Sequence, residues 1–328
     1  MKQIQRGLVA VIAFVSVQCS EASAPEGEPP AITSPSGRIA FVTEVSPFNG
    51  ALYIANSDGS GLRQLTSGPA YHSRPRWSPD RRRIVFARGS SGSATQVYVI
   101  DVDGPSAMVR VADGWDPAWS PDGSKIVFTS SGGINPGVWG IHVMNADGSD
   151  VRRLTYPNDP VRCPQGSTAM DLRPDWSPDG RRILFERRLH TSDDGDGYDC
   201  GLDGWGYRPN VYVMNADGTG LRRLGSISTR EDADPSWSPD GRLIAFSVLF
   251  DGLYVIDNEG AGPEQRVAVP LVGWGSGPVW SPDGKRLLFL NVNVPNNQLA
   301  VVDIATGVTQ VLSFPTVSGH LSDPAWSR

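Results

Sequence analysis

Residues 119–128 read WSPDGSKIVF, and this decamer is one copy of a repeat that runs through most of the 328-residue chain. Further copies start at Trp77, Trp176, Trp237 and Trp280. A degenerate copy, TSPSGRIAF, starts at Thr33, and a last partial copy, DPAWS, covers residues 323–327. Self-similarity at spacings of 42–61 residues indicates stacked supersecondary units, each of which buries its apolar face against the next unit.

The Ser-Pro-Asp-Gly segment of each copy predicts a tight turn. Proline presets φ at the first central position, aspartate suits the second, and glycine accepts the positive φ that follows. In the copy that starts at Trp77, Arg81 replaces this glycine. We therefore expect this turn to carry a strain of about 1 kcal/mol or to adopt another form.

The segment after each turn is apolar at successive positions, as in IVF at 84–86 and ILF at 183–185. A strand with two apolar faces belongs to a sheet that is sandwiched between others. A second strand such as VYVMNADG, residues 211–218, and a short third one such as LRRL, residues 221–224, follow. With the x-Pro-x-Trp segment as the innermost strand, each unit supplies four strands. Four-stranded units that stack radially form a β-propeller.

These motifs resemble the TolB-like, WD-repeat-like β-propeller family, whose signature is the Trp-Ser-Pro-Asp-Gly turn followed by an apolar strand. The resemblance covers about residues 31–328, the propeller part without the N-terminal α/β domain that TolB carries. It implies an all-β, six-bladed propeller over residues 37–328. Because residues 323–327 supply an innermost strand and the N-terminal copy lacks one, we expect the C-terminal strand to complete the first blade.

The first 24 residues have the plan of a secretory signal, with basic residues before an apolar run from Leu8 to Val17 and small residues at 22 and 24. Lipid attachment at Cys19 is the alternative to simple cleavage. Residues 25–36, rich in Pro, Glu and Ser, predict a flexible tether. Either mode of processing implies an extracytoplasmic protein that is periplasmic, secreted or lipid-anchored in the envelope, and nothing predicts a membrane-spanning segment.

The composition narrows the classes of partner. The formal net charge is −6 and no basic stripe is present, which excludes nucleic acid and anionic lipid as expected partners. Besides Cys19, the chain has Cys163 and Cys200. In an oxidising compartment an isolated pair of cysteines favours a disulfide over two free thiols.

The family geometry implies that the loops leading into the innermost strands and those between the second and third strands emerge on one face. It brings the two longest loops, 155–174 and 188–209, side by side there, where a Cys163–Cys200 disulfide would join them. Exposed aromatic side chains on this face are candidate contacts for a protein or glycan of the cell envelope, since they supply large contact area at small entropic cost. The candidates on this face are Tyr71, His72, Trp115, Trp139, Tyr198, Trp205, Tyr207, Trp274 and His320. The alternative is that they pack the long loops against each other.

The residues before the proline of each x-Pro-x-Trp segment are predicted to line the mouth of the central channel. Around the ring they are Asp323, Arg74, Asp116, Arg173, Asp234 and Gly277. Because the charges alternate, neighbours can pair and neutralise one another. This pairing also argues against a metal ion on the axis. The alternative is a polar mouth that accepts a charged group of a partner where Gly277 breaks the alternation.

The stretch LHTSDDGDGYDCGLDGWGY, residues 189–207, is rich in aspartate and glycine. The carboxylates of Asp194, Asp196 and Asp199 would suit calcium. The EF-hand spacing fails, because Tyr198 occupies the fifth position and no glutamate stands at the twelfth. We therefore expect a solvated, disulfide-pinned recognition loop and no cofactor, with calcium as the alternative.

Catalytic motifs find no match in this chain, which has no G-x-S-x-G elbow, no H-E-x-x-H pair and no glycine-rich phosphate loop. His142 occupies a strand position that holds tyrosine in other copies, and it is predicted to be structural. We expect a monomeric, non-catalytic binding or scaffold propeller. The alternative is a hydrolase or lyase at the channel mouth that uses His72 or His320 with a nearby aspartate.

Overall fold

The computed structural model of the protein describes residues 37–46, 49–90, 95–104, 107–132, 139–157, 170–190, 207–224, 232–248, 251–268, 277–291, 298–314, 317 and 319–327. These residues belong to one compact unit that spans residues 34–328. The predicted signal, tether and Cys19 lie outside the described residues. So do Cys163, Asp194, Asp196, Tyr198, Asp199, Cys200, Trp205 and Trp274.

The described residues form twenty-four β-strands and no helix, and therefore no helix that could cross a membrane. In chain order the strands are β1 (Arg38–Ser46), β2 (Asn49–Asn56), β3 (Arg63–Gln64), β4 (Tyr71–Trp77), β5 (Arg83–Gly89), β6 (Gln96–Asp101), β7 (Met108–Asp113), β8 (Trp115–Trp119), β9 (Lys125–Ser130), β10 (Gly140–Asn145), β11 (Arg152–Arg153), β12 (Met170–Trp176), β13 (Arg182–His190), β14 (Tyr207–Asn215), β15 (Arg222–Arg223), β16 (Asp232–Trp237), β17 (Leu243–Val248), β18 (Gly252–Asp257), β19 (Gln265–Ala268), β20 (Val279–Trp280), β21 (Arg286–Asn291), β22 (Gln298–Asp303), β23 (Thr309–Val311) and β24 (His320–Trp326).

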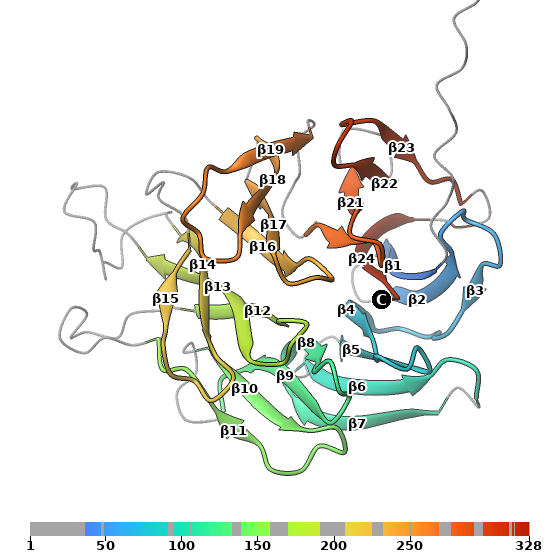
Figure 1. The fold of residues 1–328 in the computed structure, drawn as a ribbon. Coiled ribbons are helices and arrows are strands. Elements are labelled where there is room, and N and C mark those ends of the chain that lie inside the picture. Colours follow the sequence, from blue (N-terminus) through green and yellow to red (C-terminus); the bar gives the residue numbers. More distant parts are fainter. Residues whose placement is uncertain are drawn as a thin grey trace, which may run out of the picture. The chain divides into compact units, whose positions relative to one another are not determined.

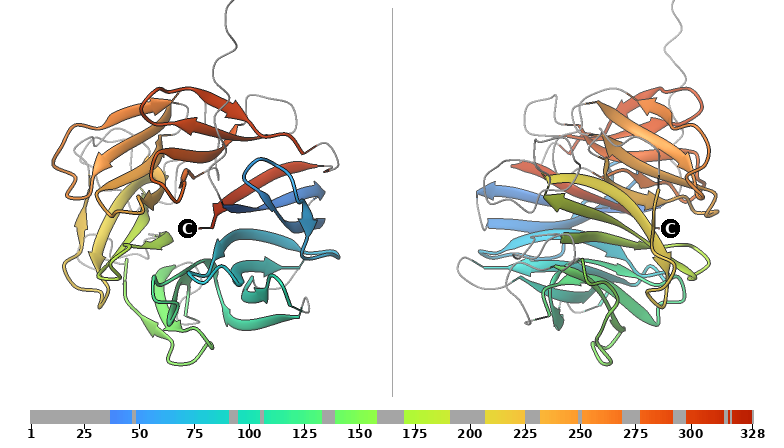
Figure 2. Two further views of the ribbon diagram at one scale, coloured as in Figure 1. Left: turned by 45° about the vertical axis from the view of Figure 1, so that its right-hand side comes forward. Right: turned by 90° about the vertical axis from the view of Figure 1, so that its left-hand side faces the viewer.

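The strands form six antiparallel sheets of four, arranged as the blades of a ring (Figure 1). Five blades use consecutive strands, and the remaining sheet has the order β24-β1-β2-β3. In this blade Trp326 pairs with Ile39, and the backbone N–H of Ser327 donates to the carbonyl of Arg38 at 2.8 Å. Figure 2 shows β24, in red, beside β1, in blue. The six-bladed propeller and its closure by the two terminal strands are therefore confirmed.

An aromatic pair recurs in most blades. The phenylalanine of the second strand lies opposite a tyrosine of the third, as in Phe41 and Tyr53, whose ring centroids are 5.8 Å apart. In the third blade His142 takes the place of the tyrosine opposite Phe128, at 5.6 Å. Burial lowers the pKa of His142, which favours the neutral imidazole. This placement agrees with the structural role that its position in the repeat predicts.

The repeat tryptophans bind the blades to one another. Each is buried in an apolar cluster that joins two adjacent sheets, as when Trp77 of β4 packs with Ala40 and Ile54 of the first blade. Arginines of the preceding blade cover three of the indoles, with Arg83 lying 4.7 Å from the ring centroid of Trp119. The signature tryptophan therefore stabilises the ring.

The Ser-Pro-Asp-Gly turns keep one backbone form. The turn glycines have φ of 67–70°, and Arg81 adopts φ of 61° at the same position. Of the two outcomes expected for Arg81, the structure therefore has the strained turn. The carbonyl of Arg81 accepts a hydrogen bond from the guanidinium of Arg38 at 2.8 Å, a contact that any residue at position 81 would retain.

The Arg81→Gly variant is expected to be more stable by up to about 1 kcal/mol. An L-residue in this region costs roughly 1–2 kcal/mol, and the larger chain entropy of glycine offsets part of the gain. Urea denaturation of both proteins measures the difference. The reverse change, Gly180→Arg, is the matched control and should lower the stability; equal stability of all three proteins would contradict the strain.

The turn aspartates predict a loss of stability in acid. Their carboxylates accept hydrogen bonds from the turn serines, and those of Ser120 and Ser124 lower the pKa of Asp122 to about 2. The pKa values of Asp80, Asp179, Asp240 and Asp283 are also lowered. Because these folded-state values lie below the unfolded value of about 3.9, the stabilisation is present above pH ~4 and is lost as the pH falls toward ~2.

Denaturation of the wild type and of Ser120→Ala at pH 6 and at pH 2.5 tests this effect. The difference in unfolding free energy between the two proteins should shrink at the lower pH, since protonation removes the same contact. A difference that does not depend on pH would contradict it.

Candidate functional site: the channel mouth

A cavity of about 560 Å³ opens at one end of the central channel, where the innermost strands begin. We call it the mouth pocket. Its lining combines the predicted channel residues with several of the predicted aromatic ones. It consists of Glu44, Tyr71, Ser73, Arg74, Trp115, Asp116, Trp139, Met170, Leu172, Arg173, Arg188, Leu290, His320, Leu321, Ser322 and Asp323.

An unusual backbone conformation places the channel residues. Five of the six residues before the prolines have φ between 47° and 57°: Arg74, Asp116, Arg173, Asp234 and Asp323. The pairing register between first and second strands shifts at each of these sites, which is a β-bulge. A left-handed conformation costs a non-glycine residue roughly 1 kcal/mol or more. The ring therefore holds strained residues where their charged side chains meet.

Arg74 is the centre of an ion-pair network in the channel. Its guanidinium lies 3.3 Å from Asp323 and 3.6 Å from Asp116, the neighbours with which pairing was predicted. It also lies 2.5 Å from Asp234, which belongs to the blade across the ring. The ion pairs therefore extend across the channel as well as around it. The paired side chains close the channel beneath the mouth pocket.

Arg173 extends the network to a residue that the repeat pattern did not reveal. Its guanidinium lies 2.8 Å from Asp234 and 2.9 Å from Glu186 of β13, which is fully buried and also binds Arg188. A sequence signal existed: the residue after the strand phenylalanine is Val42, Ala87, Thr129, Ser247 or Leu290 in the other blades. A lone glutamate at such a buried position requires a cationic partner.

The sixth position of the ring is closed. A Cβ atom on Gly277 would lie 2.6 Å from the Cβ atom of Asp234. Glycine is therefore required here, because any side chain would displace Asp234 from its two arginines. The side chain of Asp234 thus lies against the position where Gly277 breaks the alternation of charge.

The buried Asp234 and the partly exposed Asp323, both carboxylates of the ring, differ in their electrostatics. Burial alone would raise the pKa of Asp234, but Arg173 and Arg74 hold it below its ordinary value. Burial raises the pKa of Asp323, and the nearby carboxylates of Asp234 and Asp116 add to this effect against the attraction of Arg74. The negative charge of Asp323 is therefore only partly compensated.

Aromatic side chains form one wall of the mouth pocket. Trp115 is 36% exposed and meets Trp139 edge-to-face, with 5.8 Å between the ring centroids. The carbonyl of Trp139 accepts a hydrogen bond from the N–H of Asp171 at 2.9 Å, which fixes the loop before β10 against β12. Exposed His320 and half-buried Tyr71 lie in the same lining. The structure thus brings four of the predicted aromatic and histidine candidates to one cavity.

Comparison with known proteins agrees with this architecture. No family model matches the chain. A TolB homologue of Chlorobium luteolum is 28% identical over 192 residues, which are 57% of this chain and 36% of that protein. An uncharacterised protein of Agrobacterium fabrum is 29% identical over 224 residues, 66% of this chain and 68% of that protein. The crystal structure of TolB from Acinetobacter baumannii has a TM-score of 0.68 at 22% identity, with 90% of this chain and 67% of that one covered.

The chain forms a TolB-like β-propeller. It spans about a third of the length of the Chlorobium homologue, so the matched part of that relative is only one portion of the whole protein. No metal cluster is present in the described part of this TolB-like propeller, where no three His, Cys, Asp or Glu side chains come close enough to hold an ion.

His72 does not belong to the binding surface. The sequence predicts it among the exposed aromatics, yet its side chain is fully buried and stacks on Phe86, with 5.7 Å between the ring centroids. Burial, with a smaller contribution from Arg88, lowers its pKa to about 4, so the ring is neutral at physiological pH. The reason is its place within β4, where it faces the blade interior.

Another predicted surface residue, Tyr207, lies at the start of β14. Its backbone pairs with His190 in the β13–β14 ladder.

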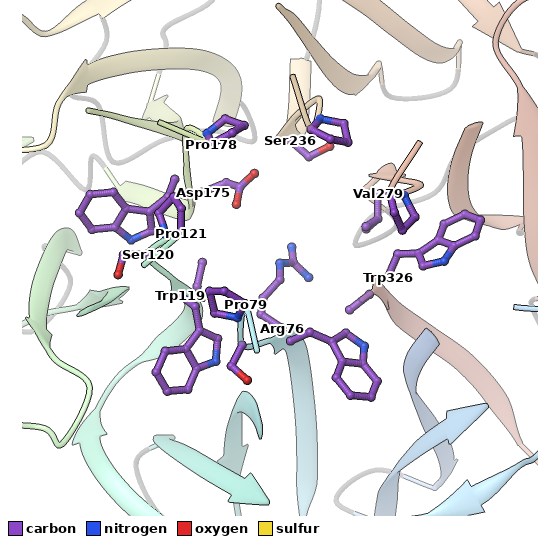
Figure 3. A pocket seen from close by; sticks show the side chains of 17 residues that line it. Arg76, Pro79, Trp119, Ser120, Pro121, Asp175, Pro178, Ser236, Val279 and Trp326 are labelled. Atoms are coloured by element: carbon purple, nitrogen blue, oxygen red, sulfur yellow. The ribbon is translucent and has the colours of Figure 1, made fainter. Parts of the chain in front are cut away.

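The opposite end of the channel of the TolB-like propeller holds a second cavity, of about 360 Å³ (Figure 3). The prolines of the turns and four of the repeat tryptophans line it, and Arg76 and Asp175 point toward its middle. Both follow the proline in their x-Pro-x-Trp segments. The Asp175 carboxylate accepts a hydrogen bond from the backbone N–H of Trp237 at 3.1 Å, so it also ties two blades together.

Proposed function

We propose that this TolB-like propeller is a non-catalytic, extracytoplasmic binding or scaffold protein that receives a protein segment or a glycan at the mouth pocket. The observation that carries the proposal is the pair of Trp115 and Trp139 on the wall of a roughly 560 Å³ cavity with a charged floor. Aromatic anchors over fixed polar groups are typical of recognition sites.

The similarity to TolB homologues supports a protein of the cell envelope as the partner and an extracytoplasmic location. The apolar leader in residues 1–24 agrees with export, and anchoring at Cys19 remains part of the proposal. The loops that contain Tyr198, Trp205 and Trp274 would extend the contact surface on the same face. The Cys163–Cys200 disulfide and the calcium alternative at Asp194, Asp196 and Asp199 remain predictions.

Removal of the aromatic wall is expected to weaken recognition strongly. With a photo-crosslinking residue at Met170 in the pocket, envelope extract should yield a crosslinked partner that is not captured from Ser149, in the exposed β10–β11 hairpin. The double variant Trp115→Ala, Trp139→Ala should weaken binding of the captured partner by roughly 30-fold or more, as expected for aromatic anchors. Tyr156→Ala removes an aromatic that is 70% exposed and outside the pocket, and it should leave the affinity unchanged.

Equal affinity of the double variant and the wild type would refute the assignment of the site. A glycan that binds in place of a protein, with the same loss in the double variant, would retain the site and change the class of ligand.

One arrangement favours the enzymatic alternative, a hydrolase or lyase at the channel mouth. Glu44 and His320 are cross-strand partners on β1 and β24, both line the pocket, and burial followed by Asp323 raises the pKa of Glu44. A carboxyl group and an imidazole on directly opposite strand positions can exchange a proton with a substrate. His72 can no longer contribute, so loss of any turnover in His320→Gln would be the decisive observation for this alternative.

A further inference from the structure

We propose that the mouth pocket binds a protein segment through a lysine or arginine side chain, whose cationic head lies beside Glu44 and Asp323. The inference rests on the proposed function, because it assigns the chemistry of the group that the same pocket receives.

The first argument is an imbalance of charge. The lining contains the guanidinium groups of Arg74, Arg173 and Arg188 and the carboxylates of Glu44, Asp116 and Asp323. Two further carboxylates, those of Asp234 and Glu186, pair with the same arginines. Among the described residues, five carboxylates thus meet three guanidinium groups. Among these described groups the carboxylates outnumber the guanidinium groups by two, and the imidazole of His320 lies in the same lining and lowers the pKa of Glu44. A cation is the ligand group that would balance the remaining negative charge.

The second argument is the location of this excess. Asp234 and Glu186 have close arginine partners, whereas no described arginine or lysine pairs with Glu44. Asp323 has Arg74 at 3.3 Å, but Arg74 also serves Asp116 and Asp234. Burial is the first cause of the raised pKa values of Glu44 and Asp323, and nearby carboxylates raise both further, whereas His320 lowers the pKa of Glu44 and Arg74 lowers that of Asp323. Negative charge that is only partly compensated therefore gathers where β1 meets β24.

The third argument is the form of the cavity, which suits a side chain better than a metal ion. Tyr71, Leu290 and Leu321 line the pocket with Glu44 and can pack against the methylene stem of lysine or arginine. An aromatic face also attracts the cationic head. A calcium ion needs six or more oxygen ligands, and no suitable cluster of even three side chains exists in the described part of the chain.

The test uses n-butylguanidinium and its uncharged analogue n-butylurea as probes of the full-length protein. Binding is followed by the indole N–H signals of Trp115 and Trp139 in NMR titrations. We expect n-butylguanidinium to shift these signals with an affinity that falls as salt is added, because charges screen one another. Glu44→Gln should weaken this binding roughly tenfold, the usual value of a hydrogen bond to a charged group. The matched control Glu259→Gln changes a glutamate in the β18–β19 hairpin and should have no effect.

Equal binding of the two probes, or an unchanged affinity in Glu44→Gln, would overturn the inference. A misfolded Glu44→Gln protein would be recognised by its indole spectrum, and Glu44→Asp, which keeps the charge, should then retain the binding. The proposed function is tested separately. If crosslinking from Met170 captures a partner equally in the wild type and in Glu44→Gln while the aromatic double variant loses it, the proposed function stands and the cation site fails. If n-butylguanidinium binds through Glu44 and no partner is captured, the cation site stands and the proposed function fails.

Discussion

Truncation after residue 318 is expected to abolish the folded state, because it removes β24 and leaves the first blade open. Trp326 and Leu321 are 3% and 6% exposed and pack in the cluster that joins the first and last blades. Loss of a buried tryptophan and a buried leucine costs about 3–5 and 2–5 kcal/mol respectively. Their sum approaches the whole stability of a typical domain, about 5–15 kcal/mol. Near-UV circular dichroism should show the loss of fixed tertiary packing.

A rearranged chain separates the loss of pairing from a general effect of shortening. Residues 319–327 followed by Pro-Asp-Gly can be inserted between residues 36 and 37, so that Ser327 and Arg38 flank a turn like that between Ser120 and Lys125. The hydrogen bonds support this equivalence, since Ser327 and Arg38 exchange the same contacts as Ser120 and Lys125. The rearranged chain, truncated after residue 318, should recover the wild-type spectrum. If it stays unfolded, the position of β24 in the chain matters beyond its pairing.

The repeat was sufficient to predict the fold, because each unit combines a turn that has a single backbone conformation with a strand that has two apolar faces. Those features are local, and the tryptophan that joins the blades belongs to the same decamer. Channel-facing positions could also be read, since they stand at a fixed place before the proline. The limits appear where the chain departs from its own repeat. Glu186 stands out on the second strand as the one charged residue at its repeat position, but the sequence does not show that its partners are Arg173 and Arg188. His72 was assigned to the surface from its loop, yet β4 begins one residue earlier and turns its ring inward.

The charge pattern predicts only some of the ion pairs in the channel. Alternation of sign around the ring predicts contacts between neighbours, and Arg74 makes these with Asp116 and Asp323. Its contact with Asp234 depends on the length of an arginine side chain and on the width of the channel, which no spacing in the sequence encodes. Two aspartates at equivalent positions thereby acquire different environments.

Asp234→Asn is expected to lower the free energy of unfolding by about 3–5 kcal/mol, the usual cost of removing one partner from a buried ion pair. One carboxylate oxygen of Asp234 lies 2.5 Å from Arg74 and 2.8 Å from Arg173, and its lowered pKa shows that the surroundings favour its charge. Asparagine has the same shape and tolerates a positive φ, so the change removes charge without new backbone strain. Urea denaturation at pH 7 measures the loss. Asp103→Asn, in an exposed pair with Arg38, is the control and should cost less than about 1 kcal/mol.

Asp323→Asn should change the free energy of unfolding in the opposite direction from Asp234→Asn. The two aspartates nevertheless have the same place in the repeat and a similar φ. The raised pKa of Asp323 means that the folded protein disfavours the charge, so the variant should be as stable as the wild type or more stable at pH 7. The sign follows from linkage: a carboxyl group with a raised folded-state pKa adds stability below its unfolded value and loses it as the pH rises through the folded value. The advantage of Asp323→Asn should therefore appear at pH 7 and vanish near pH 3. Equal losses for both aspartates would mean that the ring responds only to its total charge; opposite signs would show that the ring keeps one carboxylate paired for stability and leaves another available to a ligand.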